Sequence, residues 1–299
     1  MKRLFGAYVI VDYSAAEGKK TGESSLWIGV MKRDVRFRLS YEAHNPATRA
    51  EGLALLRGLL ADLKKRGDRV FLGLDFALAF PRGTAKKLAL KGEPWAGLWE
   101  FLAKNIVDKP DNSNNRFQVA AKMNRLMTDE AYPFWGGPKS AAQKWLSTLK
   151  PETLGDFPEL RLTEEALRKS KAATPKSLWQ MHGAGVAGGQ AMLGIAAVRG
   201  LLAEAGGGKV WPFETGFGAI DEEALDGVSV LAAEIYSDLY AGTAQGAEIK
   251  DATAVRLTAE AIADLDDKGQ LGALFVAPKA LKEAQVPVAE KEEGWILGV

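Results

Sequence analysis

The sequence predicts an α/β fold in which a mixed sheet of the order β-β-β-α-β is followed by a large helical insertion, a further strand and a helix. Two features predict this class. The segment Ala7–Ser14 begins with five consecutive apolar residues, which is typical of a strand covered on both faces. A segment of helical periodicity, 48–66, then separates two strand-like segments, and a helix in that place usually makes the second strand parallel to its neighbour.

The composition is that of a globular protein, because 47% of the 299 residues are hydrophobic and 26% are charged. We predict a single domain over 1–299, with 82–208 as a mainly helical insertion. The absence of cysteine excludes disulfides, thiolate nucleophiles and zinc–thiolate sites. With no signal-peptide pattern and no long apolar run, we expect a cytoplasmic protein without a membrane partner.

The formal net charge of +1 gives the molecule no global field that would attract nucleic acid. A nucleic-acid or nucleotide partner would therefore have to bind through a local patch. The sequence leaves the oligomeric state open.

Three strands are expected at the start of the chain, joined by links that favour an antiparallel meander. They are Ala7–Ser14, then Ser25–Val30, then Val35–Ser40. In the third segment apolar and polar residues alternate strictly, which predicts a half-exposed strand near the sheet edge.

A helix is expected from Thr48, a residue type that caps helices, to about Arg66, with Gly67 as its stop. One apolar stripe runs along it, made of Leu53, Leu56, Leu60 and Leu63. The segment Arg69–Asp75 that follows reads as another buried strand, and like the first it ends on an acid.

Residues 82–208 show little strand character, and their periodicity predicts a set of helices. These are Trp95–Asn105, Asn115–Met127, Ser140–Leu149, Thr163–Ser170 and Gln190–Glu204. Strand character returns at Lys209–Phe213 and Val228–Tyr236, although the sequence does not decide whether both join the sheet. A helix over Lys250–Leu265 is the last clear element.

Carboxylates stand at the places where α/β sheets bind ligands. Asp12 and Asp75 end the first and fourth strands, and parallel neighbours bring their carboxyl ends to the same edge. Glu234 lies near the end of a later strand, and Asp251 shares the apolar face of the last helix with Val255. Taken singly, each of these acids is as well explained by a turn, a cap or a structural hydrogen bond.

Together, four such acids would repel one another and would have raised, coupled pKa values. Divalent cations relieve that repulsion, and oxygen ligands suit Mg²⁺ or Mn²⁺. We therefore predict Asp12, Asp75 and Asp251 as metal ligands, with Glu234 as a further ligand or a base. The only histidines, His44 and His182, are more simply explained as structural residues.

A glycine-rich motif offers a competing interpretation. Gly183–Gly188 fits G-x-G-x-x-G and opens a predicted helix, but a dinucleotide-binding fingerprint requires a strand directly before it. The preceding Lys-Ser-Leu-Trp-Gln-Met-His does not read as a strand. A helix start that receives a phosphate, or lets two backbones approach, is the other alternative. The pair Lys19 and Lys20 could likewise meet a phosphate or form a solvated turn.

The order of elements resembles the ribonuclease H-like superfamily, and short motifs resemble its predicted nucleases of "domain of unknown function 429". The motifs are Leu74–Pro81, Arg161–Glu164, Gly188–Gly194, Trp211–Glu214 and Glu234–Tyr236. Two positions depart from the family pattern, since Ala77 and Ser237 stand where it often has proline. The resemblance covers roughly residues 7–265. It implies substrate-binding or supporting roles for Ser14, Arg161, Glu164 and Gln190.

The favoured hypothesis is metal-dependent hydrolysis of a phosphodiester or phosphoryl group by a nuclease-like enzyme. Two alternatives stay open. A nucleotide-binding protein of the actin-like branch would use the same kind of sheet, and a non-catalytic accessory factor in cofactor biosynthesis would keep the acids as structure.

Overall fold

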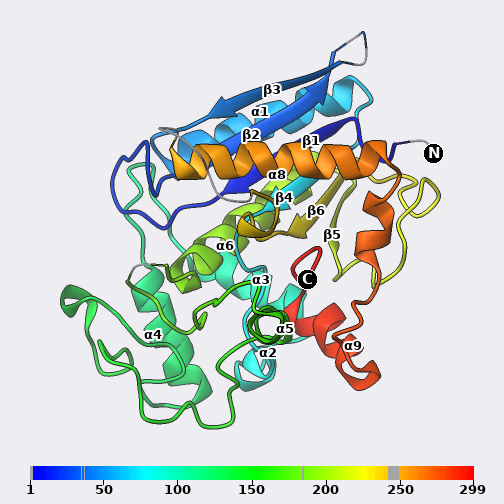
Figure 1. The fold of residues 1–299 in the computed structure, drawn as a ribbon. Helices are drawn as coiled ribbons and strands as arrows, with labels where there is room; N and C mark the ends of the chain where they lie inside the picture. The colour runs from blue at the N-terminus through cyan, green and yellow to red at the C-terminus, as the bar shows by residue number, and fades with distance from the viewer. Residues whose placement is uncertain (1–2, 35, 37, 184, 242–248) are drawn as a thin grey trace.

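The computed structural model describes residues 3–34, 36, 38–183, 185–241 and 249–299. In this part of the chain, six strands form one mixed sheet with helices on both faces, so the predicted α/β class is confirmed (Figure 1). The strands are β1 (Ala7–Asp12), β2 (Trp27–Arg33), β3 (Leu39–His44), β4 (Val70–Leu74), β5 (Gly208–Trp211) and β6 (Val230–Glu234).

The strand order across the sheet is β3-β2-β1-β4-β6-β5. β2 runs antiparallel to both β1 and β3, whereas β1, β4, β6 and β5 are parallel to one another. Both strand segments left undecided by the sequence therefore join the sheet. The register pairs Val11 with Leu74 and Leu74 with Glu234, so the carboxyl ends of β1, β4 and β6 meet at one edge.

Both faces of β1 are buried, as its unbroken apolar run predicts. Val9 packs into the core beneath α1 (Arg49–Lys65), and Ile10 packs into a second core beneath α8 (Lys250–Asp267). Each is fully buried. The carboxyl end of β1 is thus held rigidly between two layers of helix.

The helix α1 forms where its cap and leucine stripe predict it. Thr48 Oγ1 accepts a hydrogen bond from the Glu51 N–H at 3.1 Å, and the Glu51 carboxylate accepts one from the Thr48 N–H at 3.3 Å. The stripe faces the sheet, with Leu56, Leu60 and Leu63 buried and Leu53 half-buried.

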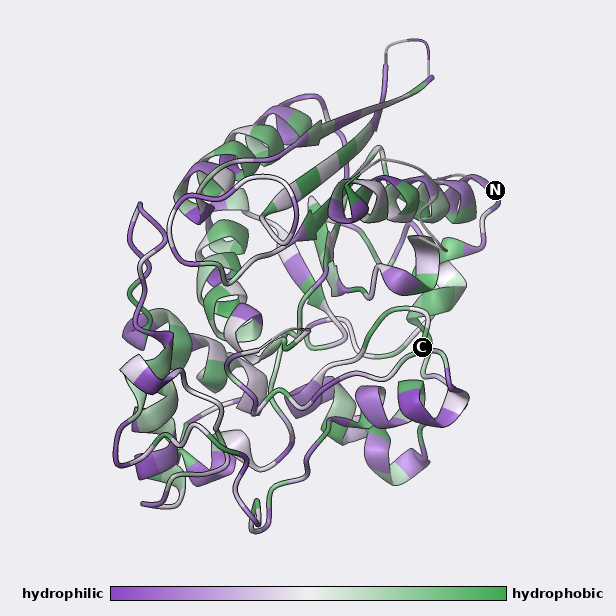
Figure 2. Ribbon diagram, turned by 60° about the vertical axis from the view of Figure 1, so that its left-hand side comes forward, coloured by the Kyte–Doolittle hydropathy of each residue, from purple (hydrophilic) through white to green (hydrophobic). Residues whose placement is uncertain are grey.

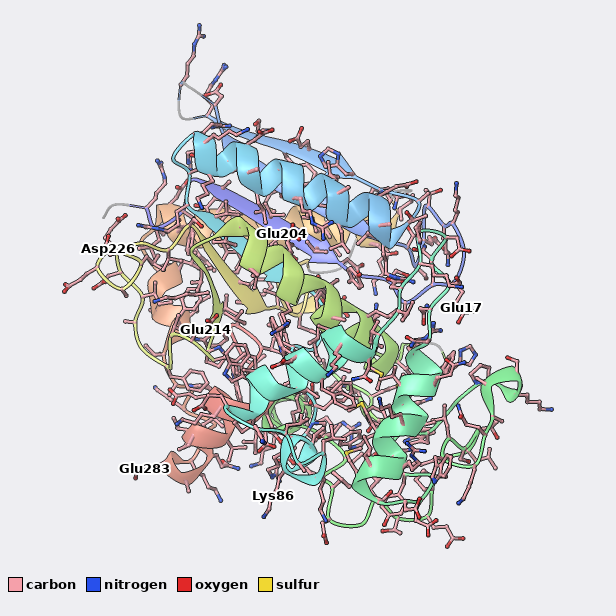
Figure 3. All side chains as sticks on the ribbon, turned by 180° about the vertical axis from the view of Figure 1, so that it is seen from behind. Glu17, Lys86, Glu204, Glu214, Asp226 and Glu283 are labelled. Carbon is pink, nitrogen blue, oxygen red and sulfur yellow. The ribbon has the colours of Figure 1, made fainter. Side chains whose placement is uncertain are left out.

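The helix α6 (Gly188–Ala205) lies beside α1 on the same face of the sheet (Figure 3). An ion pair of 2.6 Å between Arg57 and Glu204 joins the two helices. Although α6 belongs to the range 82–208, it packs as part of the layer that covers the sheet.

The opposite face is covered by α8, whose apolar side is the one the sequence predicts. Val255, Thr258 and Ile262 are fully buried against the sheet. Figure 2 shows α1 and α8 striped with hydrophobic and hydrophilic residues, as expected of helices that face a core on one side and solvent on the other.

Further helices occupy three of the predicted places in 82–208, namely α3 (Pro94–Asn105), α4 (Arg116–Met127) and α5 (Leu162–Ser170). The shorter elements are α2 (Thr84–Lys87), η1 (Lys139–Ala141), α7 (Asp238–Ala241), η2 (Leu271–Phe275), η3 (Glu283–Gln285), α9 (Val286–Val288) and η4 (Ala289–Glu293). None of the helices in the described ranges has the length and apolar composition needed to cross a bilayer.

Two predicted elements are wrong. The helix expected at Ser140–Leu149 is a short turn followed by a tight loop, because the Gln143 and Leu146 backbones bond to each other and buried Leu146 pins the loop. The strand expected at Val35–Ser40 is displaced to β3. The Asp34 carboxylate accepts the N–H groups of Arg36 and Arg38 and so stabilises a turn; residues 35 and 37 lie outside the described part of the chain.

Candidate functional site

A cleft of about 1060 Å³ opens at the edge of the sheet where β1, β4 and β6 end. Its wall also includes the first turn of α6, the short helix α7 and the start of α8. Every predicted site residue lines this cleft: Asp12, Ser14, Asp75, Arg161, Glu164, Gln190, Glu234 and Asp251. Their side chains fall into two groups with different surroundings.

Asp12 is the last residue of β1, and the pKa of its carboxylate is strongly raised. Burial raises its pKa well above the ordinary value, and the nearby carboxylates of Asp75, Asp251 and Asp238 raise it further. No hydrogen bond from a described residue compensates this charge, although Lys250 acts weakly in the opposite direction. The Asp12 oxygens are thus available to a cation.

Asp75 follows β4 directly and is held by two backbones. Its own N–H donates to Val11 O at 2.9 Å, and its carboxylate accepts hydrogen bonds from the hydroxyl and the N–H of Ser237. Burial raises the pKa of Asp75 to about 6, against the lowering effect of the Ser237 bonds and with a contribution from Asp238. This carboxylate therefore changes its charge near neutral pH.

Asp251 is presented to the cleft by the first turn of α8. Its Oδ2 accepts a hydrogen bond from the Ser24 N–H at 2.6 Å, which ties the loop after β1 to the helix. The Asp251 carboxylate lies near Asp12, and its negative charge raises the pKa of Asp12. Asp12, Asp75 and Asp251 thus all line one cleft, and their role as metal ligands stays a prediction.

A further acid of this group, Asp238, is absent from the sequence-based prediction. It stands on α7, just after β6, lines the cleft and acts on both Asp12 and Asp75. Lys250 Nζ lies 3.7 Å from one of its oxygens. The signal available in the sequence was an acid in the turn directly after a strand, four residues beyond Glu234.

Glu234 belongs to a second, buried group and does not face the cleft as a free carboxylate. Arg161 grips it with two nitrogens, Nη1 at 2.8 Å from one oxygen and Nη2 at 2.5 Å from the other. The Leu78 N–H donates to Glu234 Oε2 at 3.0 Å as well. With these donors in place, Glu234 holds Arg161 and the segment after β4. This geometry favours a structural role for Glu234 over the predicted role of additional metal ligand or base.

Arg161 and Glu164 are likewise structural in their contacts. Arg161 is fully buried, and its guanidinium also binds Glu164 and the carbonyl of Glu293. Burial acts to lower the pKa of Arg161, but the carboxylates of Glu164 and Glu234 outweigh it and raise the pKa. The Arg161 side chain therefore stays charged and joins β6, α5 and the C-terminal segment.

Ser14 and Gln190 shape the loop that follows Asp12. Ser14 Oγ donates to Ser24 O and accepts from the Ala16 N–H, both at 3.2 Å. Gln190 Nε2 donates to Tyr13 O at 2.6 Å, which ties the first turn of α6 to the end of β1. These contacts position the loop, and Gln190 thereby binds the residue that follows Asp12 in the chain.

The glycine motif opens a helix, as predicted, but in the described residues no strand directly precedes it; residue 184 lies outside them. Its glycines serve a close approach of two backbones. A Cβ on Gly188 would lie 2.6 Å from Gln180 O and closer still to Leu178 O. This packing favours the backbone-approach alternative over a dinucleotide fingerprint. His182 lines the cleft, whereas His44 ends β3.

The donor set of the cleft suits a hard divalent cation, although it is not a complete metal site as it stands. Within the described ranges, no three His, Cys, Asp or Glu side chains stand close enough to hold a metal ion. The Asp12, Asp75, Asp238 and Asp251 carboxylates nevertheless offer only oxygen ligands, and their mutual repulsion is what a cation relieves.

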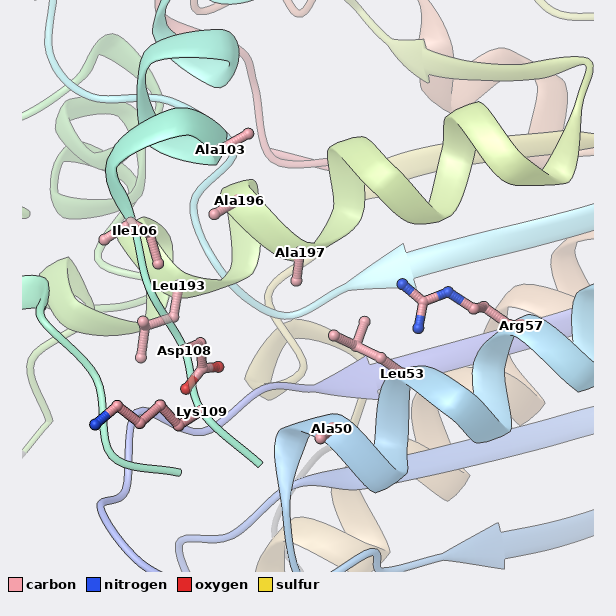
Figure 4. A pocket seen from close by; sticks show the side chains of 10 residues that line it. All are labelled: Ala50, Leu53, Arg57, Ala103, Ile106, Asp108, Lys109, Leu193, Ala196 and Ala197. Carbon is pink, nitrogen blue, oxygen red and sulfur yellow. The ribbon is translucent and has the colours of Figure 1, made fainter. Parts of the chain in front are cut away.

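A smaller cavity of about 300 Å³ lies between α1, α3 and α6 (Figure 4). Its lining is mostly alanine and other apolar side chains. Two of its charged residues are paired, Arg57 with Glu204 and Asp108 with Arg49 at 2.6 Å. The larger cleft, where Asp12 is buried among other carboxylates that raise its pKa, is the better candidate for a functional site.

Comparison with protein-family models, curated proteins and solved structures gives no match for this chain. The resemblance to ribonuclease H-like nucleases therefore stays a prediction. Any functional conclusion has to be drawn from the geometry of the cleft.

Proposed function

We propose that the protein is a divalent-metal-dependent hydrolase of phosphodiester or phosphoryl groups, with a sheet of ribonuclease H-like type. The observation that carries this proposal is that Asp12, Asp75, Asp238 and Asp251 line one cleft at the edge of the sheet. The last three of these acids raise the pKa of Asp12. The strand order and the antiparallel β2 and β3 agree with the predicted order of elements. A single sheet of this kind gives no specific support to the actin-like alternative.

In this proposal Asp12, Asp75 and Asp251, assisted by Asp238, would hold Mg²⁺ or Mn²⁺. The bound ions would activate a water and stabilise the leaving oxygen of the phosphodiester. The chain itself positions the ligands: Ser237 fixes Asp75, and the Ser24 N–H fixes Asp251. The Arg161–Glu234 pair holds β6 and thereby α7, which carries Asp238.

Positive side chains also line the cleft, where they stand among the acids and could contact substrate phosphates. Lys20, Arg116, Lys176 and Lys250 all line it. Together with the net charge of +1, this arrangement favours a short or single-stranded nucleic-acid substrate over general binding of duplexes.

The proposal is tested by hydrolysis assays with single-stranded, duplex and hybrid oligonucleotides, and with bis(p-nitrophenyl) phosphate, in Mg²⁺, Mn²⁺ or EDTA. We expect hydrolysis that EDTA abolishes and that Asp12→Asn lowers by roughly a hundredfold or more, because the carboxylate holds the metal. The control is Asp62→Asn, since that acid is 75% exposed on α1 and away from the cleft.

Cleavage that persists unchanged in Asp12→Asn, or no metal-dependent cleavage of any substrate, would contradict the proposal. Binding of ATP without cleavage would favour the nucleotide-binding alternative instead.

A further inference from the structure

The first turn of α6 presents backbone donors to the same cleft as the acids. Ala187, the residue before the helix, supplies no side-chain cap. No described residue accepts a hydrogen bond from the N–H groups of Gly188, Gly189 or Gln190. Gly189 and Gln190 line the cleft. The start of this 18-residue helix therefore carries donors that no described residue satisfies, and the positive end of the helix dipole.

Arg116 adds a buried positive charge at this turn. The residue is only 6% exposed, yet its Nε has no hydrogen-bond partner in the described part of the chain. Its Nη1 is shared between Asn114 Oδ1 at 2.9 Å and Glu17 Oε1 at 3.0 Å. A buried guanidinium with an unused donor is costly, so its present partners leave the Arg116 charge incompletely compensated.

The guanidinium lies directly against α6. A Cβ on Gly189 would stand 3.2 Å from Arg116 Nε and 3.4 Å from the Cβ of Ala15, so the glycine leaves room for this approach. On its other side the guanidinium carbon lies 4.3 Å from the ring centroid of Phe117. With a ring over one face and Nε buried against Gly189, an anion would reach Arg116 at Nη1, where the exposed Glu17 carboxylate now binds.

This positive corner is joined to the acids through the end of β1. Gln190, in the first turn of α6, donates to the carbonyl of Tyr13, the residue after Asp12. Ser14, Ala15 and Ala16 continue the cleft wall from Asp12 toward Arg116. One extended ligand can therefore meet both the acids and the positive corner.

We propose that Arg116 and the N–H groups of Gly189 and Gln190 form a phosphate-binding subsite, which holds a second phosphate of the substrate beside the one at the acids. Anion binding here does not depend on the proposed function; only the identity of the substrate does. The substrate class is then a dinucleotide or longer strand that carries neighbouring phosphates. A phosphomonoester with one phosphate would use only half of the cleft.

Glu17 is the competitor of this phosphate. Its side chain is 59% exposed and pairs with Arg116 Nη1, so an incoming phosphate would displace a solvated carboxylate and not a buried one. The position of Glu17 in Figure 3, on the loop beside the start of α1 and clear of the core, agrees with such an exchange.

The binding test uses inorganic phosphate in EDTA, followed by amide proton–nitrogen correlation spectra of the full chain. We expect the Gly189 and Gln190 amide signals to shift on titration. Arg116→Gln should weaken the affinity roughly tenfold or more, because a charged hydrogen-bonding partner is lost. Glu17→Gln should strengthen it, and Arg57→Gln, which removes an exposed charge on α1, should leave it unchanged.

Shifts confined to other amides, or equal phosphate affinity in the wild type and in Arg116→Gln, would overturn the subsite. If Arg116→Gln fails to fold, Glu17→Gln decides alone, since an affinity that does not rise contradicts the competition described above.

A second measurement separates this subsite from the proposed function. The dinucleotide TpT is compared with its form phosphorylated at both ends, as substrates in Mn²⁺. We expect a lower KM for the phosphorylated form in the wild type and loss of that preference in Arg116→Gln. Phosphate binding at Gly189 and Gln190 without any hydrolysis would contradict the proposed function alone. Hydrolysis without a preference for the phosphorylated dinucleotide, and without phosphate binding at these amides, would contradict the subsite alone.

Discussion

At the scale of single residues, Asp12 shows how a site can be built at the expense of stability. Burial and three neighbouring carboxylates raise its pKa, so the ionised form is less favourable in the folded protein than in the unfolded chain. The unfolded chain therefore loses its proton first as pH rises, and stability falls between the ordinary carboxyl pKa and the raised one. Above both values the whole penalty is present.

Asp12→Asn should therefore stabilise the metal-free protein at pH 8, because the neutral amide removes the burial and repulsion that disfavour the ionised carboxylate. The gain should shrink toward pH 4, where the wild-type carboxyl is protonated in both states. Urea unfolding in EDTA across this pH range measures it, with Asp62→Asn as the exposed control. A variant that is less stable than the wild type at pH 8 would mean that the carboxylate has a stabilising partner.

The same scale shows which site residues the sequence could predict. Asp12 and Asp75 follow from buried strands that end on an acid, and Asp251 follows from helical spacing. The pairing of Arg161 with Glu234 joins residues 73 positions apart, and no local pattern encodes it. Asp238 stands on a helix of one turn, which has no periodicity to read.

At the scale of elements, α6 depends on glycines for two different contacts. Gly188 touches the backbone of the segment 178–180, whereas a Cβ on Gly194 would run into the ring of Phe76, which follows β4. A Cβ on Gly200 of the same helix would meet no atom within 4 Å. The helix is thus pressed against its neighbours at Gly188 and Gly194, whereas the side that carries Gly200 is open.

Gly188→Ala should cost at least about 2 kcal/mol of stability, because backbone carbonyls cannot swing away as side chains do. Gly200→Ala, the matched change, should instead add about 0.5–1 kcal/mol through helix propensity. Urea unfolding of both variants tests the pair. Similar stabilities for the two would show that the segment 178–180 does not lie against α6.

Helices and strands could be predicted where periodicity and caps act together, as in α1 with Thr48 and its leucine stripe. They could not be predicted where a single side-chain contact overrides the periodic pattern. The Asp34 carboxylate binds the N–H groups of Arg36 and Arg38 where the sequence alternates strictly, and the loop around Leu146 uses a buried apolar residue as an anchor within an irregular segment. Such contacts leave no period in the sequence.

At the scale of the whole molecule, the sheet is what brings distant acids together. The parallel order of β1, β4 and β6 collects the ends of three strands, and α8, which packs on β1 and β2, brings Asp251 to the same edge (Figure 1). The acids come from residues 12, 75, 238 and 251, so the cleft exists only in the folded chain. A cation that binds there must therefore stabilise the whole fold.

Mn²⁺ should accordingly raise the melting temperature, by an amount that depends on pH. A metal concentration a hundredfold above Kd adds about 2.7 kcal/mol. Because the metal must displace protons from carboxyls with raised pKa, about 6 for Asp75, the gain should be larger at pH 8 than at pH 5. Thermal unfolding with and without Mn²⁺ measures this, and Asp12→Asn/Asp75→Asn should lose the gain while Asp62→Asn keeps it. An equal gain at both pH values, or in the double variant, would place any bound metal elsewhere on the protein.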